Sequence, residues 1–294
     1  MIIRDRPDTW QILTAVRGSV LPQVTPSILI FTLIACSVVA LDRLTPLVPH
    51  LNSGAYTVFG IGLSLFLGFR NNAAYDRWWE ARKNWGGLLA DLRSFAREVE
   101  VFVDDEARRR EMLSLSLDFL HAHRMALRRL PFPDTGYGAA FGSSAAPACA
   151  ALNAVSDALG RARHEASVDG FGAMRLAERL ASMNLHQANC ERIANSPLPF
   201  VYSLLVYRTS WLYCLLLPLA LVQDTGWLTP IFSAVVAYMF LGLAEVTEEL
   251  SHPFGRSKNA LPLDSICRAA EISLAPHMNI PAPEPLAPKG HYLS

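Results

Sequence analysis

Residues 61–82 read IGLSLFLGFRNNAAYDRWWEAR, and the change of character within this stretch decides the fold. The first nine residues are apolar or small, whereas the remainder are rich in amide, aromatic and charged side chains. Ile61, Leu65 and Phe69 recur every four residues, which places them on one face of a helix. The stretch therefore predicts one helix that runs out of an apolar environment directly into a charged one.

The apolar stripe of this helix has two interpretations. It can pack against neighbouring helices, which small residues favour because they allow close approach. The small residues nearby are Gly60, Gly62 and Gly68. Alternatively, the stripe can line a pore. From the residues alone, packing between helices is the favoured interpretation, because it is the usual role of such a stripe.

Four stretches are candidate membrane spans, since a crossing helix needs about 20 mostly apolar residues. They are residues 20–41, residues 51–69, a segment within residues 193–223, and residues 225–244. Arg70 follows the second stretch, and Glu245 follows the fourth. The third stretch, interrupted only by Arg208, is too long for one simple crossing. Part of it is therefore expected at the membrane interface or against other protein.

The alternative is a soluble protein with buried core helices, and the loop charges count against it. The loop after the first stretch offers only Arg43, and the turn between the third and fourth has no Lys or Arg. Basic residues gather instead near Arg4, Arg6 and Arg17, in residues 70–83, and in residues 256–268. Because basic loops stay on the cytosolic side, both termini and the middle segment are predicted to be cytosolic.

The predicted fold is an all-α integral membrane protein with four transmembrane helices and a cytosolic helical domain. Helical periodicity in the middle segment follows an apolar run from Leu88 to Phe102 and predicts helices at residues 106–130, 148–163 and 172–194. The predicted parts are an N-terminal segment with two spans (1–83), a cytosolic helical domain (84–195), spans three and four (196–250), and a cytosolic C-terminal segment with a proline-rich tail (251–294).

Composition and motifs give no support for an enzyme, a metal site or a nucleic-acid-binding protein. Lys and Arg number 26, as do Asp and Glu, so the basic footprint of nucleic-acid binding is missing. The five cysteines are far apart, form no CxxC pair, and are expected to be reduced. His121 and His123 are two positions apart on a predicted helix, so they point away from each other and cannot share a metal. No metal and no cofactor is predicted.

An acidic cluster follows the fourth span. Glu245, Glu248 and Glu249 share one face of a continuing helix, where the three carboxylates repel one another unless cations compensate. The natural partners are Arg70, Arg77 and Arg82, which follow the second span. The simple interpretation is a solvated helix end with weak exposed ion pairs. The sharper hypothesis is a structural clamp through bidentate arginine contacts.

Four motifs, in order along the chain, resemble the bestrophin family, most closely its bacterial members. The most specific is the run from Phe69 to Arg82, which resembles FRNNxAYDRWWEAR. The others are Arg17-Gly18-Ser19-Val20, then Glu191-Arg192-Ile193 with Pro197-Leu198-Pro199-Phe200, then His252-Pro253-Phe254-Gly255 with Leu261-Pro262-Leu263-Asp264. The four-span topology with cytosolic termini agrees with this resemblance.

The resemblance implies a homopentamer in the bacterial inner membrane, with one central pore for monovalent ions. By resemblance, Ile61, Leu65 and Phe69 line a hydrophobic neck, so the stripe becomes pore-lining rather than a packing surface. Five copies of such apolar rings would form a narrow constriction that dewets, which is a known way to gate ions. A second constriction is expected at the cytosolic exit, with Leu180 or Met183 as candidates. The implied partners are further copies of the chain and the lipid bilayer.

Activation and selectivity are where this chain departs from the animal members. Animal bestrophins are calcium-activated chloride channels with an acidic run after NPFG, whereas residues 256–260 here read RSKNA. Two cations and no carboxylate cannot form the oxygen-rich cage that calcium needs. The resemblance to bacterial members favours passive conduction of cations such as sodium. The alternatives are an anion (chloride) channel of the same architecture and, from another class, a membrane-anchored scaffold or sensor.

Overall fold

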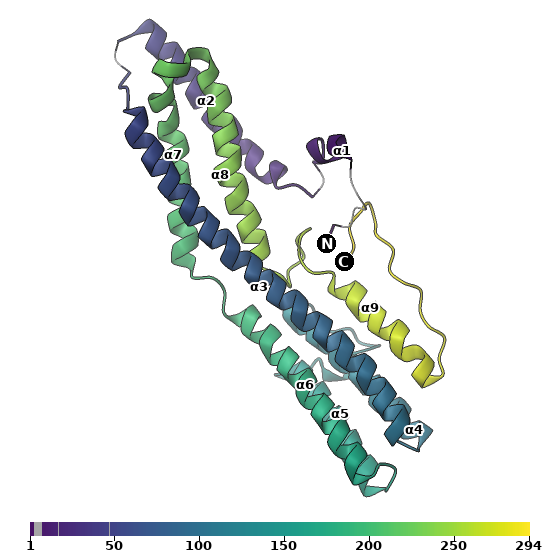
Figure 1. Ribbon diagram of the computed structural model, residues 1–294. Helices are drawn as coiled ribbons and strands as arrows, with labels where there is room; N and C mark the ends of the chain where they lie inside the picture. The colour runs from purple at the N-terminus through teal and green to yellow at the C-terminus, as the bar shows by residue number, and fades with distance from the viewer. Residues whose placement is uncertain (3–7, 17, 47) are drawn as a thin grey trace. The chain divides into compact units, whose positions relative to one another are not determined.

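The regular structure of this chain is helical. The computed structural model describes residues 1–2, 8–16, 18–46 and 48–294 (Figure 1). Within them, the only β-pairing is two isolated bridges, Ile2 with Tyr292 and Lys289 with Tyr292. The all-α prediction is therefore confirmed. Three arginines that entered the predicted orientation or a family motif, Arg4, Arg6 and Arg17, lie outside the described residues.

Nine α-helices and three short 3₁₀ turns are found in the described residues. The α-helices are α1 (Thr9–Leu13), α2 (Leu21–Leu44), α3 (Ser53–Phe102), α4 (Glu106–Arg128), α5 (Pro147–His164), α6 (Gly170–Asn195), α7 (Phe200–Thr225), α8 (Thr229–Ser251) and α9 (Leu263–Leu274). The 3₁₀ turns are η1 (Ala139–Phe141), η2 (Gly226–Leu228) and η3 (Ala275–Met278). As the sequence predicted, α3 continues without a break from its apolar part into its charged part.

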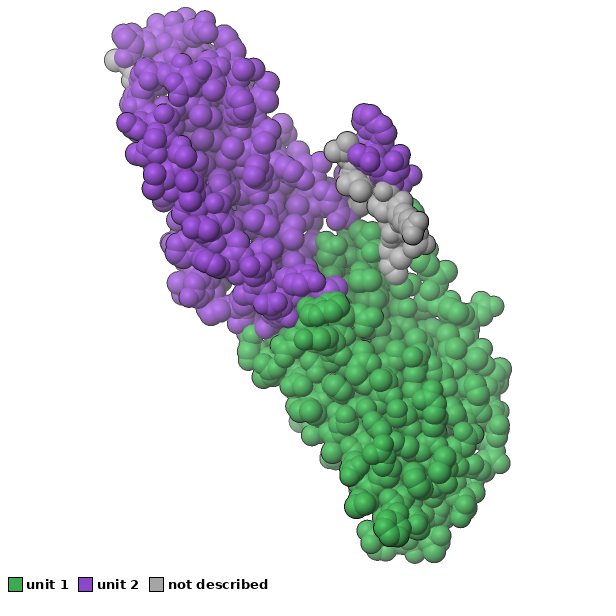
Figure 2. All heavy atoms as spheres, viewed as in Figure 1, with its two compact units in different colours: residues 1–4, 79–196, 253–294 green, residues 5–78, 197–252 purple. Residues whose placement is uncertain are grey.

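The chain divides into two compact units (Figure 2). Unit 1 contains Met1–Arg4, Trp79–Ser196 and Pro253–Ser294, and unit 2 contains Asp5–Trp78 and Pro197–His252. The predicted parts divide at 83/84, 195/196 and 250/251, whereas the units divide at 78/79, 196/197 and 252/253. The two segments predicted to be cytosolic thus fall almost entirely in unit 1.

Unit 2 holds α2, the first part of α3, α7 and α8. Helices α2, α7 and α8 contact one another in pairs. One buried cluster centres on Phe31, Cys214 and Ala237, and a second joins Leu63 and Leu67 of α3 to apolar residues of α7 and α8. Between α7 and α8 the chain turns at Gly226, whose φ of +52° is a conformation that glycine adopts without strain.

Among the residues that the structure describes, two stretches meet the length and hydropathy criterion for a membrane span. They are Leu21–Leu44, with mean hydropathy 2.3, and Phe200–Ser251, with mean hydropathy 1.8, which comprises α7, η2 and α8. The most apolar window of the first is only 22% buried, so apolar side chains cover its surface. The predicted span at residues 51–69 lies in the first part of α3 and is not one of these stretches. The number of crossings, four, stays a prediction.

Of the three glycines proposed to allow close helix approach, only Gly60 meets a neighbouring side chain. A Cβ atom added at Gly60 would lie 2.5 Å from Tyr213 Oη, whereas one added at Gly62 or Gly68 would meet nothing within 4 Å. The Tyr213 ring cannot move away freely, because it stacks on Tyr56 with ring centroids 4.4 Å apart. The close packing of α3 against α7 at Gly60 therefore requires a residue without a side chain.

Unit 1 holds the second part of α3 with α4, α5, α6 and α9. The Asp105 carboxylate accepts a hydrogen bond from the Ala107 backbone N–H at 2.8 Å and caps α4. Asp169 caps α6 in the same way, through the Gly172 N–H at 2.6 Å. The predicted helices at 106–130, 148–163 and 172–194 correspond to α4, α5 and α6. Helix α9, which contacts α4, was not predicted.

We expect Gly60→Ala to lower the stability of the folded protein by roughly 1–3 kcal/mol, because the added methyl group overpacks the contact with Tyr213. Gly62→Ala is the matched control, since alanine favours a helix over glycine and has open space there. Thermal melting in detergent measures both. Equal melting temperatures for the two variants would contradict this account.

Candidate functional site

The three predicted neck residues lie on the exposed face of α3. Ile61 and Leu65 are each 57% exposed in the single chain, and Phe69 is 70% exposed. Their neighbours Leu63 and Leu67 are 5% and 1% exposed and belong to the core of unit 2. One face of the helix thus packs inside the unit, while the predicted stripe presents apolar side chains outward.

The two candidates for the cytosolic constriction have a different environment. Leu180 is 7% exposed and Met183 is 0% exposed, so both side chains pack within unit 1. The large apolar side chains that α6 exposes are instead Phe171, Met174 and Leu185. A cytosolic constriction at Leu180 or Met183 stays a prediction.

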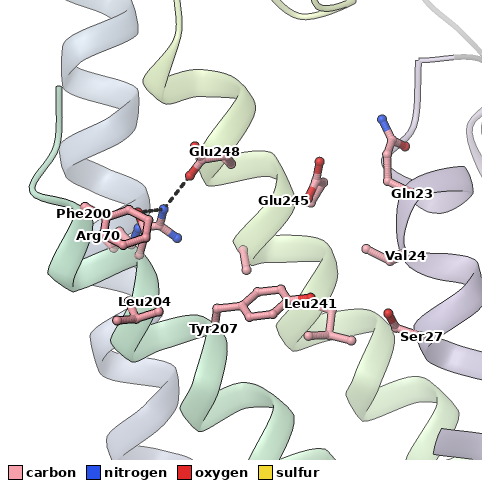
Figure 3. Close-up of a pocket in the computed structure, with 12 residues that line it drawn as sticks. Gln23, Val24, Ser27, Arg70, Phe200, Leu204, Tyr207, Leu241, Glu245 and Glu248 are labelled. Carbon is pink, nitrogen blue, oxygen red and sulfur yellow. Dashed lines mark hydrogen bonds and ion pairs between the residues drawn. The ribbon is translucent and has the colours of Figure 1, made fainter. Parts of the chain in front are cut away.

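Arg70 and Glu248, one arginine and one carboxylate of the predicted clamp, form an ion pair (Figure 3). Arg70 Nη2 donates to Glu248 Oε2 at 2.8 Å and to Ser203 Oγ at 2.7 Å. Arg77 donates through Nε to the Ser251 carbonyl oxygen at 2.9 Å, a backbone contact that the sequence did not predict. The pair therefore ties α3 to α8, and Ser203 adds α7.

Three further members of the predicted clamp are Glu249, Glu245 and Arg82. Glu249 Oε1 accepts from Gln23 Nε2 at 3.5 Å, which links α8 to the first turn of α2. Glu245 lines a cavity together with Arg70 and Glu248. Arg82 belongs to unit 1, whereas the three carboxylates belong to unit 2.

Burial makes the Arg70–Glu248 pair more than a solvated helix end. Arg70 is 9% exposed, and its Nε is buried without a hydrogen-bond partner among the described residues. A buried cation is costly unless it is paired, because it loses its hydration. Glu248 keeps about half of its side chain exposed, at 49%, so solvent screens part of the attraction.

A second ionic site anchors α9 within unit 1. Asp264, the last residue of the LPLD motif, accepts from Arg124 Nη1 at 2.5 Å and from Arg128 Nη1 at 2.6 Å. Burial opposes ionisation of Asp264, but the two arginines together outweigh it and hold the pKa of this carboxyl below its ordinary value of 3.8. The site joins the C-terminal segment to α4.

The side chains of His121 and His123 make structural contacts within unit 1. His121 Nε2 lies 2.8 Å from Glu271 Oε1. His123 stacks against Trp85 with ring centroids 5.5 Å apart, and complete burial lowers the pKa of its imidazole to about 3, so the ring is neutral. Among the described residues, no three His, Cys, Asp or Glu side chains are grouped so that they could hold a metal ion.

We expect Arg70→Gln and Glu248→Gln each to destabilise the protein by about 1–3 kcal/mol and to be non-additive when combined, since each removes the same interaction. The exposed pair Glu106 and Arg110, whose side chains are 59% and 56% exposed, serves as control and should contribute about 0.5 kcal/mol or less. Melting curves of the single and double variants give the coupling energy. Strictly additive effects would count against the clamp.

We expect Asp264→Asn to lower the melting temperature at neutral pH. The difference from the parent protein should shrink as the pH falls below 3.8, because a carboxyl with a depressed pKa stabilises above its unfolded pKa and loses this contribution as pH falls through the folded one. Asp134→Asn, at an exposed loop position, is the control. A stability difference that is independent of pH would argue against an ionic role for Asp264.

Comparisons with known proteins identify the family to which the chain is similar. A family model described as Bacterial/Fungal Bestrophin protein matches residues 1–276. The voltage-dependent anion channel-forming protein mll4386 of Mesorhizobium japonicum is 41% identical, covering 100% of this chain and 97% of the relative. The voltage-dependent anion channel-forming protein YneE of Escherichia coli K12 is 36% identical, covering 99% of each chain.

A solved structure gives the same result at the level of the fold. The crystal structure of a bacterial bestrophin homologue from Klebsiella pneumoniae superimposes with a TM-score of 0.81 at 28% sequence identity, covering 86% of this chain and 97% of that one. The motifs, the helical order and the whole-chain match lead to one conclusion. This chain is an all-α integral membrane protein and belongs to the bestrophin family.

Proposed function

We propose that this protein forms an ion channel that conducts anions. The support for a channel is its family membership, and the support for anions is that several relatives carry the name voltage-dependent anion channel-forming protein. This choice replaces the preference for cations such as sodium that the sequence suggested. No charged selectivity filter supports the preference for cations, because an apolar neck does not select an ion by charge.

The observation that carries the pore assignment is the two-sided character of α3. Ile61, Leu65 and Phe69 are exposed, although Leu63 and Leu67, which lie between them in the sequence, are buried in unit 2. An outward apolar stripe in a membrane protein faces lipid, another subunit or a lumen. We assign it to the lumen of a homopentamer in the bacterial inner membrane, where rings of these side chains would form a dewetting constriction. Both termini are proposed to be cytosolic.

Activation by calcium is not part of this proposal. In residues 256–260 the side chains are those of Arg, Ser, Lys, Asn and Ala, so this segment offers no carboxylate. Calcium sites in proteins are built from six to eight oxygen ligands, usually with several carboxylates.

The reversal potential of the purified protein in a planar bilayer tests the selectivity. Under a potassium chloride gradient we expect it to lie near the equilibrium potential of chloride, and replacing chloride with a large organic anion should shift it. A potential that follows the potassium or sodium gradient would restore the cation interpretation. The absence of any ionic current or liposome flux would instead favour a scaffold or sensor.

We expect Leu65→Ala to raise conductance or open probability, because it widens the proposed neck without removing a core side chain. Leu67→Ala is the matched control: it deletes the same atoms two positions away, at a residue that is 1% exposed. That change should cost roughly 2–5 kcal/mol of stability and leave conductance nearly unchanged. Equal conductance and equal open probability of the Leu65→Ala and parent proteins would remove Leu65 from the pore lining.

A further inference from the structure

Unit 2 contains a cavity that no sequence motif indicated. Its volume is about 430 Å³, and its walls come from α2, α3, α7 and α8 (Figure 3). Cavities of this size hold small molecules or parts of larger ones. Because four helices far apart in the sequence each contribute a few residues, no local pattern could reveal it.

The cavity has a polar end and an apolar end. Arg70 is the first charge after the apolar part of α3, Glu245 and Glu248 lie in the last turns of α8, and Gln23 lies in the first turn of α2. These polar groups therefore lie where three apolar helices end. The other end, toward the middle of these helices, is mainly apolar: Leu204, Leu241 and the ring of Tyr207 line it, together with Ser27 (Figure 3). A cavity of this kind fits a molecule with a polar head and an apolar body.

The polar end carries one cation and two carboxylates. Arg70 uses Nη2 for Ser203 and Glu248, and guanidinium has five N–H donors, so other donors remain. One of them, on Nε, is buried without a partner in the part of the chain that the structure describes. Glu245 has no hydrogen bond or ion pair within the same residues. The site thus offers a cationic donor and a free carboxylate to the same ligand.

We propose that this cavity binds the head group of a phospholipid with a primary ammonium group, such as phosphatidylethanolamine. Its phosphate would accept from the Arg70 guanidinium, and its ammonium would donate to Glu245. An anionic lipid is disfavoured because it would meet two carboxylates, and a trimethylammonium head group has no N–H to donate. The proposal goes beyond ion conduction and depends only on unit 2 lying in a membrane.

Native mass spectrometry and thermal melting of the detergent-purified protein test this. The probes are phosphatidylethanolamine, phosphatidylcholine and phosphatidylglycerol with identical acyl chains, together with water-soluble glycerophosphoethanolamine. We expect phosphatidylethanolamine to bind roughly tenfold more tightly than the other two lipids, as one charge-assisted hydrogen bond allows. Equal binding of the three lipids, or a preference for phosphatidylglycerol, would overturn the proposal. Tight binding of glycerophosphoethanolamine alone would also overturn it, because the site would then recognise a soluble ligand.

Glu245→Gln separates head-group recognition from folding. It removes the charge of a side chain that holds no other element, so the protein should fold and still bind lipid, but the preference for phosphatidylethanolamine over phosphatidylcholine should disappear. Glu106→Gln, the same change at an exposed position in unit 1, should keep the preference. A Glu245→Gln protein that still distinguishes the two lipids would refute the assignment, whatever its channel activity.

Discussion

Polar residues with low or intermediate exposure recur every seven positions along α3, and each has a partner on another helix. They are Arg70, Arg77, Asn84, Asp91 and Glu98, of which Arg70, Asn84 and Asp91 are buried. In unit 2, Arg70 meets Ser203 of α7 and Glu248 of α8, and Arg77 meets the end of α8. In unit 1, α6 supplies the partners: His186 and Asn189 for Asn84, Arg179 for Asp91, and Arg175 and Arg179 for Glu98. Because an unpaired buried polar group costs free energy, these partners decide which helices can pack on α3.

An apolar series with the same spacing accompanies the polar one. Its members, Leu67, Ala74, Ala81, Leu88 and Phe95, are all 1% exposed or less. The two series alternate at steps of three and four residues, which is the heptad arrangement that keeps one face of a long helix toward its neighbours. The apolar series provides the buried hydrophobic contacts of α3, and the polar series determines which helices pack against it. The polar members also change in kind, from arginines in unit 2 to an amide and carboxylates in unit 1.

Local and periodic features of this fold could be predicted from the sequence. The helices of the middle segment were predicted because apolar residues recur at helical spacing and Asp105 marks a helix start. Helix α9 could have been found in the same way, since Leu263, Cys267, Ala270 and Leu274 form one buried face. The heptad of α3 was overlooked because half of its positions are polar, and polar residues are ordinarily assigned to the solvent side.

Contacts between distant segments were harder to predict. The sequence predicted that arginines after the second span meet carboxylates after the fourth. It did not predict that Arg70 pairs with Glu248 while Arg77 donates to a backbone carbonyl, because that choice depends on helix rotation. The burial of Leu180 and Met183 within unit 1 shows the same limit, because nothing local in the sequence distinguishes a buried face of a helix from an exposed one. The cavity beside Glu245 has no sequence signal, since each helix gives it only a few side chains.

The heptad also constrains how the proposed pore can open. Leu65 is ~160° around the helix from both Leu63 and Leu67, so burying those two residues points Leu65 outward. Rotating α3 enough to withdraw the stripe would take the whole polar series away from its partners, at about 1–3 kcal/mol for each buried group left unpaired. Such a rotation would therefore cost several kcal/mol. If Ile61, Leu65 and Phe69 line the pore as proposed, α3 therefore keeps its orientation during gating, and the water and ions in the neck change instead.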